Sequence, residues 1–139
     1  MAMVNVTDIP SGHRRTVYVP AVSAGTDKKY PLFEADKDLT VTKAVFIPSA
    51  NITGADTDTM SVKVINAGDD GSGTTLIASK AYTDGVDATA LVPEDLTLSS
   101  TAANLDVDEG EVVAYFNDQS GTSGLAAPIG VIEVEFHYR

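Results

Sequence analysis

Cysteine and tryptophan are absent from this chain of 139 residues, and histidine occurs only twice. Without cysteine there is no disulfide bond, no thiolate nucleophile and no cysteine-ligated zinc site. His13 and His137 lie near opposite ends of the chain, so no histidine pair has the close spacing of a metal-binding motif. These absences leave the redox compartment open, but they exclude several kinds of catalytic and metal chemistry.

Long hydrophobic runs are also missing. No apolar stretch approaches the roughly 20 residues that cross a bilayer. The first residues, MAMVNVTDIPSG, lack the basic region followed by an apolar region that marks a signal peptide. We therefore expect neither secretion through a signal peptide nor a membrane partner.

Basic residues are scarce, at nine against twenty acidic residues, which gives a formal net charge of −11. Binding to nucleic acid depends on lysine and arginine to neutralise phosphates, so we expect no nucleic-acid partner. The charge is uneven, because residues 1–43 are nearly neutral and the acidic excess lies in residues 44–139. Two interpretations stay open: a solvated acidic surface, or a near-neutral first third that docks on a partner.

Helical periodicity is missing as well, and short alternating runs take its place from residue 14 onward. In the last run, GVIEVEFHYR, one side of a strand would carry Ile132, Val134, Phe136 and Tyr138. The linker GDDGSG predicts a hairpin between TMSVKVINAG and TTLIASKAYT. The triplet DEG, at residues 108–110, predicts a tight reversal that joins two paired antiparallel strands.

This pattern predicts an all-β chain of about eight short strands joined by Gly-, Asp-, Asn- and Ser-rich loops. A single antiparallel β-sandwich over residues 14–139 would bury the apolar sides of these strands. Residues 1–13 lack the alternation and are predicted to form an extended N-terminal arm.

No catalytic, cofactor-binding or metal-binding residue can be assigned from a motif. The loop NAGDDGSGTT, at residues 66–75, gathers oxygen donors but lacks the ligand order of a calcium loop, and an ordinary turn is favoured. The segment SGTSG, at 120–124, has Leu125 where a nucleophile elbow needs glycine. We therefore expect no enzyme activity and no cofactor.

Nine aromatic residues could supply a platform for stacking sugars. Most of them lie within alternating runs, where a position in the core is favoured. If the chain is nevertheless a carbohydrate-binding module, we expect replacement of Tyr82 or Tyr115 to abolish binding.

The arm carries apolar residues that gain nothing from exposure to water. They and the two arginines that follow are the candidate partner contacts: Met3, Val4, Val6, Ile9, Arg14 and Arg15. We expect the arm to become ordered on an adjacent subunit or another protein, with the arginines meeting acidic groups there. A frayed terminus is the alternative.

Most of the chain from residue 17 onward falls into four segments, in this order: VYVPAVSAGTDKKYPLFEA, LTVTKAVFIPSANITGADTDTMSVKVINAGDDGSGTTLIAS, STAANLDVDEGEVVAYF and PIGVIEVEFHYR. Their order, the G-x-G-T loop at 71–74 and the terminal VEFHYR strand resemble small structural proteins of tailed-bacteriophage virions. Those proteins are of the jelly-roll type that decorates capsids or builds head fibres. The resemblance covers residues 17–139.

The resemblance implies a jelly-roll-like β-sandwich that binds the outer surface of the capsid and performs no catalysis. It also implies two partners, the major capsid protein and further copies of the chain in a homotrimer. Such a protein is made in the host cytoplasm and ends on the exterior of the virion. The alternatives are a carbohydrate-binding β-sandwich module and a receptor-contacting fibre or tail accessory protein.

Overall fold

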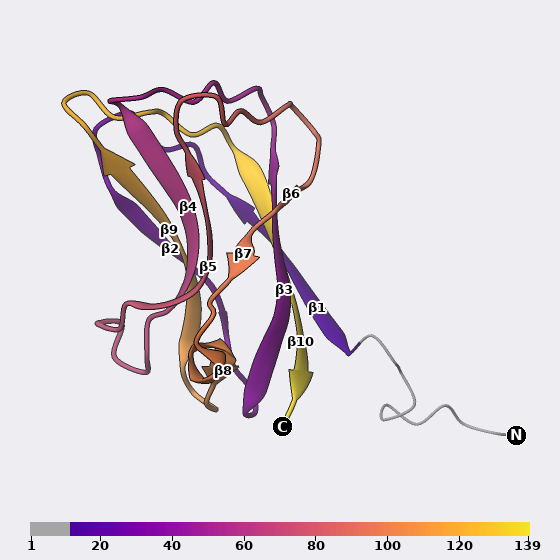
Figure 1. Cartoon of the computed structure of the whole chain (residues 1–139). Coiled ribbons are helices and arrows are strands. Elements are labelled where there is room, and N and C mark those ends of the chain that lie inside the picture. The colour runs from indigo at the N-terminus through magenta and orange to yellow at the C-terminus, as the bar shows by residue number, and fades with distance from the viewer. Residues whose placement is uncertain (1–11) are drawn as a thin grey trace, which may run out of the picture.

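The computed structural model describes residues 12–139 as two facing antiparallel sheets (Figure 1). Sheet A contains β1 (His13–Val19), β10 (Gly130–Tyr138), β3 (Leu39–Pro48), β6 (Glu94–Asp95) and β8 (Asp106–Val107). Sheet B contains β2 (Lys28–Glu34), β9 (Val112–Ser120), β4 (Thr59–Asn66), β5 (Thr75–Tyr82) and β7 (Thr97–Leu98). A short 3₁₀ helix, η2 (Ala102–Leu105), precedes β8, and the described residues contain no α-helix.

The strands pair as a nested set. β1 pairs with β10, β2 with β9, β3 with β6, and β4 with β5, so each pair encloses the next in the sequence. The chain is thus one long antiparallel double strand, which is rolled so that β10 also pairs with β3 and β9 with β4. This nesting is the jelly-roll topology, and it confirms the predicted all-β, jelly-roll-like sandwich.

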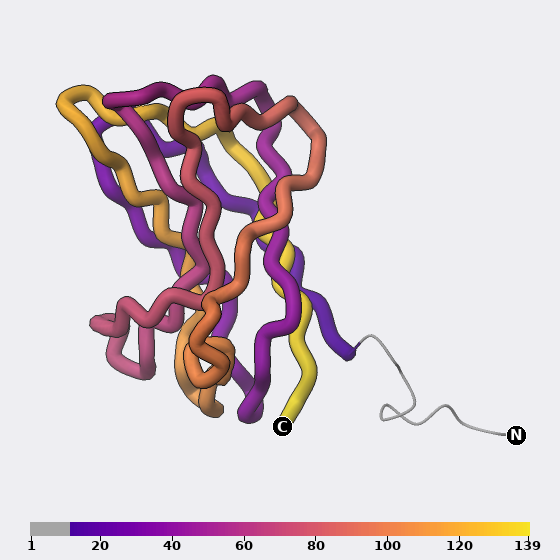
Figure 2. Tube along the Cα trace, in the orientation of Figure 1, coloured from indigo at the N-terminus to yellow at the C-terminus, as the bar shows by residue number. Residues whose placement is uncertain are grey.

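The final strand lies inside its sheet rather than at an edge. Figure 2 shows β10, in yellow, running between β1 and β3 to the end of the chain. Ile132, Val134 and Phe136 are buried, as the alternation predicts, and Tyr138 is half-buried. The strand therefore supplies both backbone pairing and core side chains until its last residues.

The core fills the space between the two sheets. Its largest fully buried side chains include Tyr82, Tyr115, Phe46, Phe136 and Met60. They come from both sheets, because residues on the inner faces alternate with outward residues along each strand. In the described part of the chain, every buried side-chain nitrogen or oxygen has a hydrogen-bond partner.

Two details differ from the sequence predictions. The reversal at 108–110 exists, with Gly110 at φ +89°, but the strands around it do not pair with each other. β8 pairs with β3 in sheet A, whereas β9 lies in sheet B, so the turn crosses between sheets and the predicted pairing is wrong. The residues of such a turn set its backbone angles, but they do not decide whether the next strand stays in the same sheet.

The boundary of the arm also shifts slightly. β1 begins at His13, one residue before the predicted start of the sandwich. By contrast, the predicted hairpin around GDDGSG is confirmed by the pairing of β4 with β5. Within residues 12–139, no helix has the length and apolar character needed to cross a membrane.

Candidate interaction surfaces

The predicted partner-contact residues fall into two groups. Met3, Val4, Val6 and Ile9 lie outside the described residues. The two arginines lie at the beginning of β1, on opposite sides of the strand, and each contacts other side chains of this chain.

Arg14 lies on the outer face of sheet A, opposite Glu135 of β10. Its Nη2 donates a hydrogen bond of 2.7 Å to Glu135 Oε1. This bond, together with the charges of Glu135 and Glu133, raises the pKa of the Arg14 guanidinium. Its contact with acidic groups of another protein stays a prediction, and that contact would have to compete with Glu135.

Arg15 points to the other side of β1, toward an aromatic group at the margin of the sandwich. Its guanidinium lies 5.4 Å from the ring centroid of Phe136 and 5.9 Å from that of Phe33, within the range of a cation–π interaction. The ring of His13 lies 5.7 Å from Phe136 and 4.5 Å from Tyr138. The first residues of β1 are therefore held against the core by their side chains.

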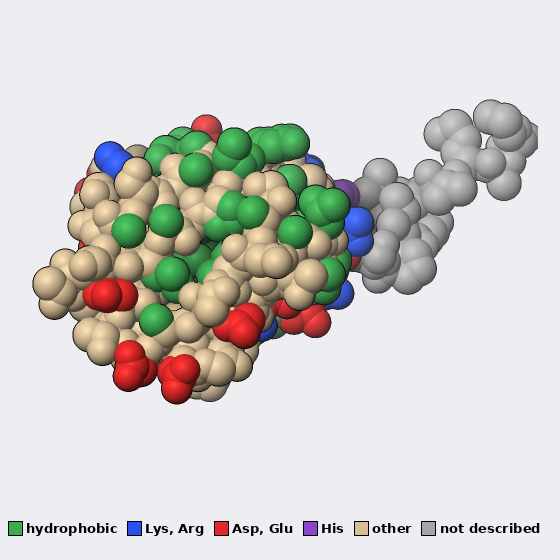
Figure 3. Space-filling model, turned by 90° about the horizontal axis from the view of Figure 1, so that it is seen from above, with side chains coloured by type: hydrophobic (Ala, Val, Ile, Leu, Met, Phe, Trp, Pro, Cys, Tyr) green, Lys and Arg blue, Asp and Glu red, His purple; other side chains and the backbone are tan. Residues whose placement is uncertain are grey.

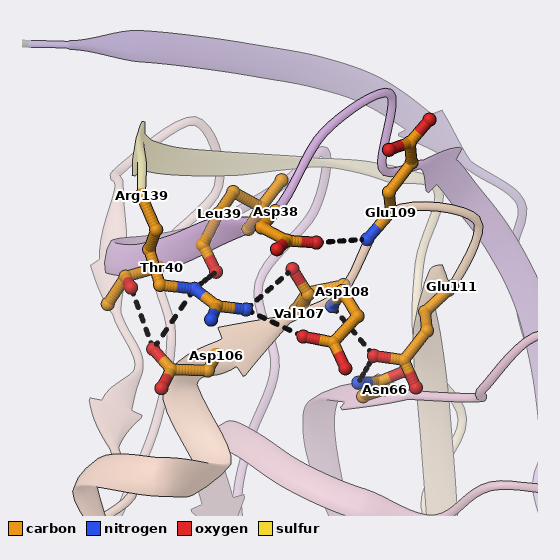
Figure 4. Close-up of polar contacts among 10 residues, drawn as sticks. All are labelled: Asp38, Leu39, Thr40, Asn66, Asp106, Val107, Asp108, Glu109, Glu111 and Arg139. Atoms are coloured by element: carbon orange, nitrogen blue, oxygen red, sulfur yellow. Dashed lines mark hydrogen bonds and ion pairs between the residues drawn. The ribbon is translucent and has the colours of Figure 1, made fainter.

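The end of sheet A that contains the C-terminus is closed by a polar network around Arg139 (Figure 4). The guanidinium donates to the carbonyl oxygens of Leu39 and Val107, at 3.2 and 3.3 Å, and to Asp108 Oδ1 at 2.8 Å. The Asp108 bond is the main cause of the raised pKa of Arg139. One side chain thus ties the last strand to β3 and to the turn after β8, and we call this network the terminal clamp.

Carboxylates around the terminal clamp bind backbone groups of nearby turns. Asp38 Oδ1 accepts a hydrogen bond from the Glu109 amide at 2.8 Å. Glu111 Oε1 accepts from the Asp108 amide at 2.7 Å and from Asn66 Nδ2 at 3.1 Å (Figure 4). Although this end is rich in acids, these side chains act within the fold.

The oxygen-rich loop at 66–75 also uses its side chains internally. Asp70 Oδ1 accepts bonds from the Ser72 amide and hydroxyl, at 2.9 and 2.7 Å, and these bonds lower the pKa of Asp70. Asn66 Oδ1 accepts from the Gly68 amide at 2.9 Å. Among residues 12–139, no three His, Asp or Glu side chains are grouped so that they could hold a metal ion.

The aromatic side chains are mostly in the core, as expected. Tyr82 and Tyr115 are fully buried, so neither can stack against a sugar, and the prediction that their replacement would test carbohydrate binding directly is wrong. Burial raises the pKa of the Tyr115 hydroxyl to about 12. Tyr18 is the exception, because 79% of its surface is exposed.

Exposed hydrophobic side chains gather at the end of sheet A opposite the terminal clamp. The four large ones that the described residues expose are Tyr18 (79%), Leu91 (75%), Ile129 (48%) and Val92 (45%). Figure 3 views the molecule from this end and shows hydrophobic side chains over its upper and central parts, with most of the visible carboxylates along the lower margin.

Strand pairing and backbone hydrogen bonds place these residues on neighbouring segments at one end of sheet A. Tyr18 of β1 pairs with Val131 of β10, and Val131 pairs with Ile47 of β3, all half-buried or exposed on the outer face. The Ser49 amide donates to the carbonyl of Ile129, and the Leu91 amide donates to that of Pro48, both at 2.8 Å. The set runs across the sheet from β1 to the segment beside β3. We call it the apolar row: Tyr18, Ile47, Leu91, Val92, Ile129 and Val131.

Leu91 has an unusual backbone. Its φ is 65°, the only positive φ of a non-glycine residue in the described part of the chain. A non-glycine residue in this region costs on the order of 1–3 kcal/mol unless its surroundings stabilise it. Leu91 therefore combines a strained backbone with an apolar side chain that is exposed to water.

The outer face of sheet B also carries apolar side chains, but they are better covered. Ile65, Ala67 and Ala114 form a small buried cluster. Phe116 packs against this cluster, and the ammonium groups of Lys29 and Lys63 lie 5.1 and 5.6 Å from the centre of its ring. Lysine side chains therefore cover Phe116, and the exposed large hydrophobic side chains of the described residues belong to the apolar row instead.

The apolar row was missed in the sequence. The sequence contains one indication of it, in the run TVYVPAV. Side chains alternate along a strand, so Val17 and Val19 face inward and Tyr18 faces outward. Leu91, Val92 and Ile129 lie in loops far apart in the sequence. Only the jelly-roll topology brings them to one end of sheet A.

Comparisons with known proteins add little. No protein-family model matches the chain, and no curated protein matches it. The fold is similar to a chain in the structure of infectious bursal disease virus, Gx strain, with a TM-score of 0.36 and 14% sequence identity. That match covers 91% of this chain and 33% of the viral chain, so this chain spans a third of the viral chain's length. A likeness at this level assigns no function.

Proposed function

We propose that this chain is a non-enzymatic structural protein of a bacteriophage virion that binds the outer surface of the capsid. The observation that carries the proposal is the apolar row, an open contact surface on a jelly roll whose buried polar side chains are all paired within the described residues. Jelly rolls occur in viral capsid proteins and in lectins. Because a fold alone does not determine function, the proposal also relies on the resemblance of the segment order to phage virion proteins.

The partners in this proposal are the major capsid protein and further copies of the chain in a homotrimer. The acidic character of the chain suits the exterior of a particle, because packaged DNA would repel it from the interior. Residues 1–11 would bind the adjacent subunit or the capsid shell through Met3, Val4, Val6 and Ile9.

Co-sedimentation with empty capsids of the phage that carries this gene tests the proposal. We expect the purified chain to pellet with the capsids at saturable stoichiometry, and to be visible on their outer surface by electron microscopy. A chain that stays in the supernatant at every concentration would contradict the proposal. A broad hydrolase screen on the same preparation should give no turnover, and activity there would contradict the non-enzymatic role.

Deletion of residues 2–11 tests the predicted contact of the arm. We expect capsid binding or subunit association to weaken at least about tenfold, which is roughly 1.4 kcal/mol of binding free energy. The melting temperature of the sandwich should stay nearly unchanged, because β1 begins after the deletion. A deletion variant that binds and assembles like the full chain would show that the arm is a frayed terminus.

A carbohydrate-binding module is the second candidate, and Tyr18 is the observation that favours it. Its exposed ring lies beside Pro20, Ala21 and Ile129 around a shallow depression. A glycan array tests this candidate, with Tyr18→Ala as the informative variant. Specific hits that this variant loses would favour sugar binding over capsid binding.

A further inference from the structure

We propose that residues 3–9 fold back and pair with the free edge of β1, so that they add one more antiparallel strand to sheet A. β1 lies at one end of that sheet and pairs with β10 on its other side. An edge strand leaves alternate backbone N–H and C=O groups unpaired, and these groups can bind an added strand. This inference goes beyond the proposed function, which leaves the position of the arm open, and it does not depend on capsid binding.

Among the edge strands within residues 12–139, β1 is the least protected. β6, β7 and β8 have only two residues each and offer little to pair with. β2 contains Pro31, which has no N–H, and its pairing with β9 shifts register between Pro31 and Phe33. Proline and such irregularities are the devices that protect sheet edges. β1, by contrast, presents seven residues in continuous register without proline, so its edge is the one best suited to an added strand.

The residues between the arm and β1 have the sequence of a hairpin turn. In Ile9-Pro10-Ser11-Gly12, proline is at the second position and glycine at the fourth, which is the preference of a type I turn. A type I turn followed by a residue in the left-handed conformation makes a three-residue hairpin loop. Gly12 has a φ of +69°, and a Cβ there would lie 2.6 Å from the carbonyl oxygen of Phe136. The residue that leads into β1 therefore has the conformation that this loop needs, and its surroundings require glycine.

The loop also sets the register of the added strand, because it places Ile9 opposite His13. Counting back from this pair, three arm residues face outward together with their partners on β1. These pairs are Asp8 with Arg14, Val6 with Thr16, and Val4 with Tyr18. The outward side of the added strand is thus charged near the turn and apolar beside Tyr18, where the proposed capsid contact needs it.

Charge agrees with this register at Arg14. Its Nη2 donates to Glu135 Oε1 at 2.7 Å on the β10 side, and 58% of the Arg14 side chain remains exposed. A guanidinium has five N–H donors, so the carboxylate of Asp8 can bind it from the opposite side. Opposite charges directly across two strands favour pairing. A shift of one residue would turn Asp8 to the inner side of the sheet, away from Arg14.

The added strand should be only marginally stable. The entropy lost when the arm becomes ordered offsets most of the gain from a single ladder at the edge of a sheet. We therefore still expect the melting temperature to change little when residues 2–11 are deleted. Pairing is better tested by the proximity of two residues than by stability.

Paired cysteine substitutions test the proposal on the full chain, which has no cysteine of its own. The test variant combines Val6→Cys with Thr16→Cys, because residues directly opposite each other in two strands lie within reach of a disulfide. The control combines Asn5→Cys with Thr16→Cys, whose side chains would point to opposite faces of the sheet. The two closed loops differ by one residue, so an unpaired arm would form both disulfides at nearly the same rate.

Under mild oxidation of dilute protein, we expect the test variant to form its intramolecular disulfide at least about tenfold faster than the control. Thr16 is exposed, so both variants should keep the circular dichroism spectrum of the wild type. Equal rates in the two variants, or no disulfide in either, would overturn the proposal. A disulfide between two chains, seen as a dimer on a non-reducing gel, would also overturn it, because the added strand would then come from another copy.

The capsid function is tested separately, since the disulfide is measured on the isolated chain. A chain that forms the expected disulfide but does not pellet with capsids would contradict only the capsid function. A chain that pellets with capsids but forms both disulfides equally would contradict only the added strand.

Discussion

The two ends of sheet A differ in how their side chains find partners. At the terminal clamp, Arg139 and the nearby carboxylates make their contacts within the chain, to backbone carbonyls, amides and each other. At the opposite end, Tyr18 and Leu91 extend into solvent. Since water solvates exposed charges well but exposed apolar surface poorly, the second end needs a partner more than the first. We therefore interpret the side chains of the charged end as stabilising the fold, and those of the apolar end as a surface for contact with a partner.

Removal of residues 136–139 should lower the stability of the fold more than any other change considered. It deletes the terminal clamp together with Phe136, a fully buried side chain whose loss alone costs about 3–5 kcal/mol. We expect the melting temperature, measured by circular dichroism, to fall by roughly 10 °C or more, or cooperative unfolding to disappear.

The substitution Arg139→Ala is the control for this truncation, because it keeps the strand and removes only the terminal clamp. Its melting temperature should fall by less. If the truncated chain is as stable as the wild type, the final strand does not have the structural role assigned to it.

The paired hydroxyl of Tyr115 should produce the next largest effect, at high pH. Because burial raises the pKa of this hydroxyl to about 12, the folded chain keeps the proton that the unfolded chain releases near pH 10. Its stabilising contribution is complete below pH 10 and is lost as the pH rises through about 12. We expect chemical denaturation to show a loss of about 2–3 kcal/mol over this range.

Tyr115→Phe should flatten that alkaline decline, although Tyr82, whose pKa is also raised by burial, will contribute part of it. At neutral pH the variant should lose about 1 kcal/mol, because Asn117 Nδ2 loses its bond to the Tyr115 hydroxyl at 3.1 Å. An unchanged alkaline profile would mean that this hydroxyl titrates normally.

Leu91→Gly tests the apolar end with a smaller effect of opposite sign. Glycine adopts a positive φ without strain, so the single copy should be as stable as the wild type or more stable, by up to about 1 kcal/mol. Binding to capsids should weaken at the same time, because the side chain is gone. A variant that loses stability would show that Leu91 contributes to the fold rather than to a contact.

The smallest effect is expected at the acidic end of the pH range. The Tyr138 hydroxyl donates to Asp36 at 2.8 and 3.0 Å, and this bond lowers the pKa of Asp36 from its ordinary value of 3.8. The stabilisation is therefore present above about pH 4 and is lost as the pH falls through the lowered pKa. Tyr138→Phe should have a slightly lower melting temperature than the wild type at pH 6, and the difference should shrink toward pH 3.

The sequence predicts most of the fold for a definite physical reason. A half-buried strand alternates its side chains, so the inward positions of β10 and the hairpin between β4 and β5 can be identified before any coordinates. β-Bulges limit this approach. Val41 and Lys43 pair with neighbouring residues of β10, so Thr42 is an extra residue that reverses the alternation within β3.

The contact surface is harder to predict than the fold. Tyr18 lies between Val17 and Val19, which face the core, and only its alternate position in the strand separates it from them. Leu91 and Ile129 are loop residues without a periodic pattern, and the backbone of each is hydrogen-bonded to the segment at the end of β3. The arginines chosen from the sequence lie on β1 as expected, but their contacts within the chain depend on pairing with β10.

Chemical labelling of Tyr18 tests the central claim most directly. Tetranitromethane should nitrate Tyr18 readily in dilute protein, and mass spectrometry can follow it beside the buried Tyr82 and Tyr115, which should stay unmodified in the folded chain. The account predicts that Tyr18 becomes protected when the chain is bound to capsids. If Tyr18 remains as reactive on capsids as in the dilute chain, the apolar row is not a contact surface of the assembled particle.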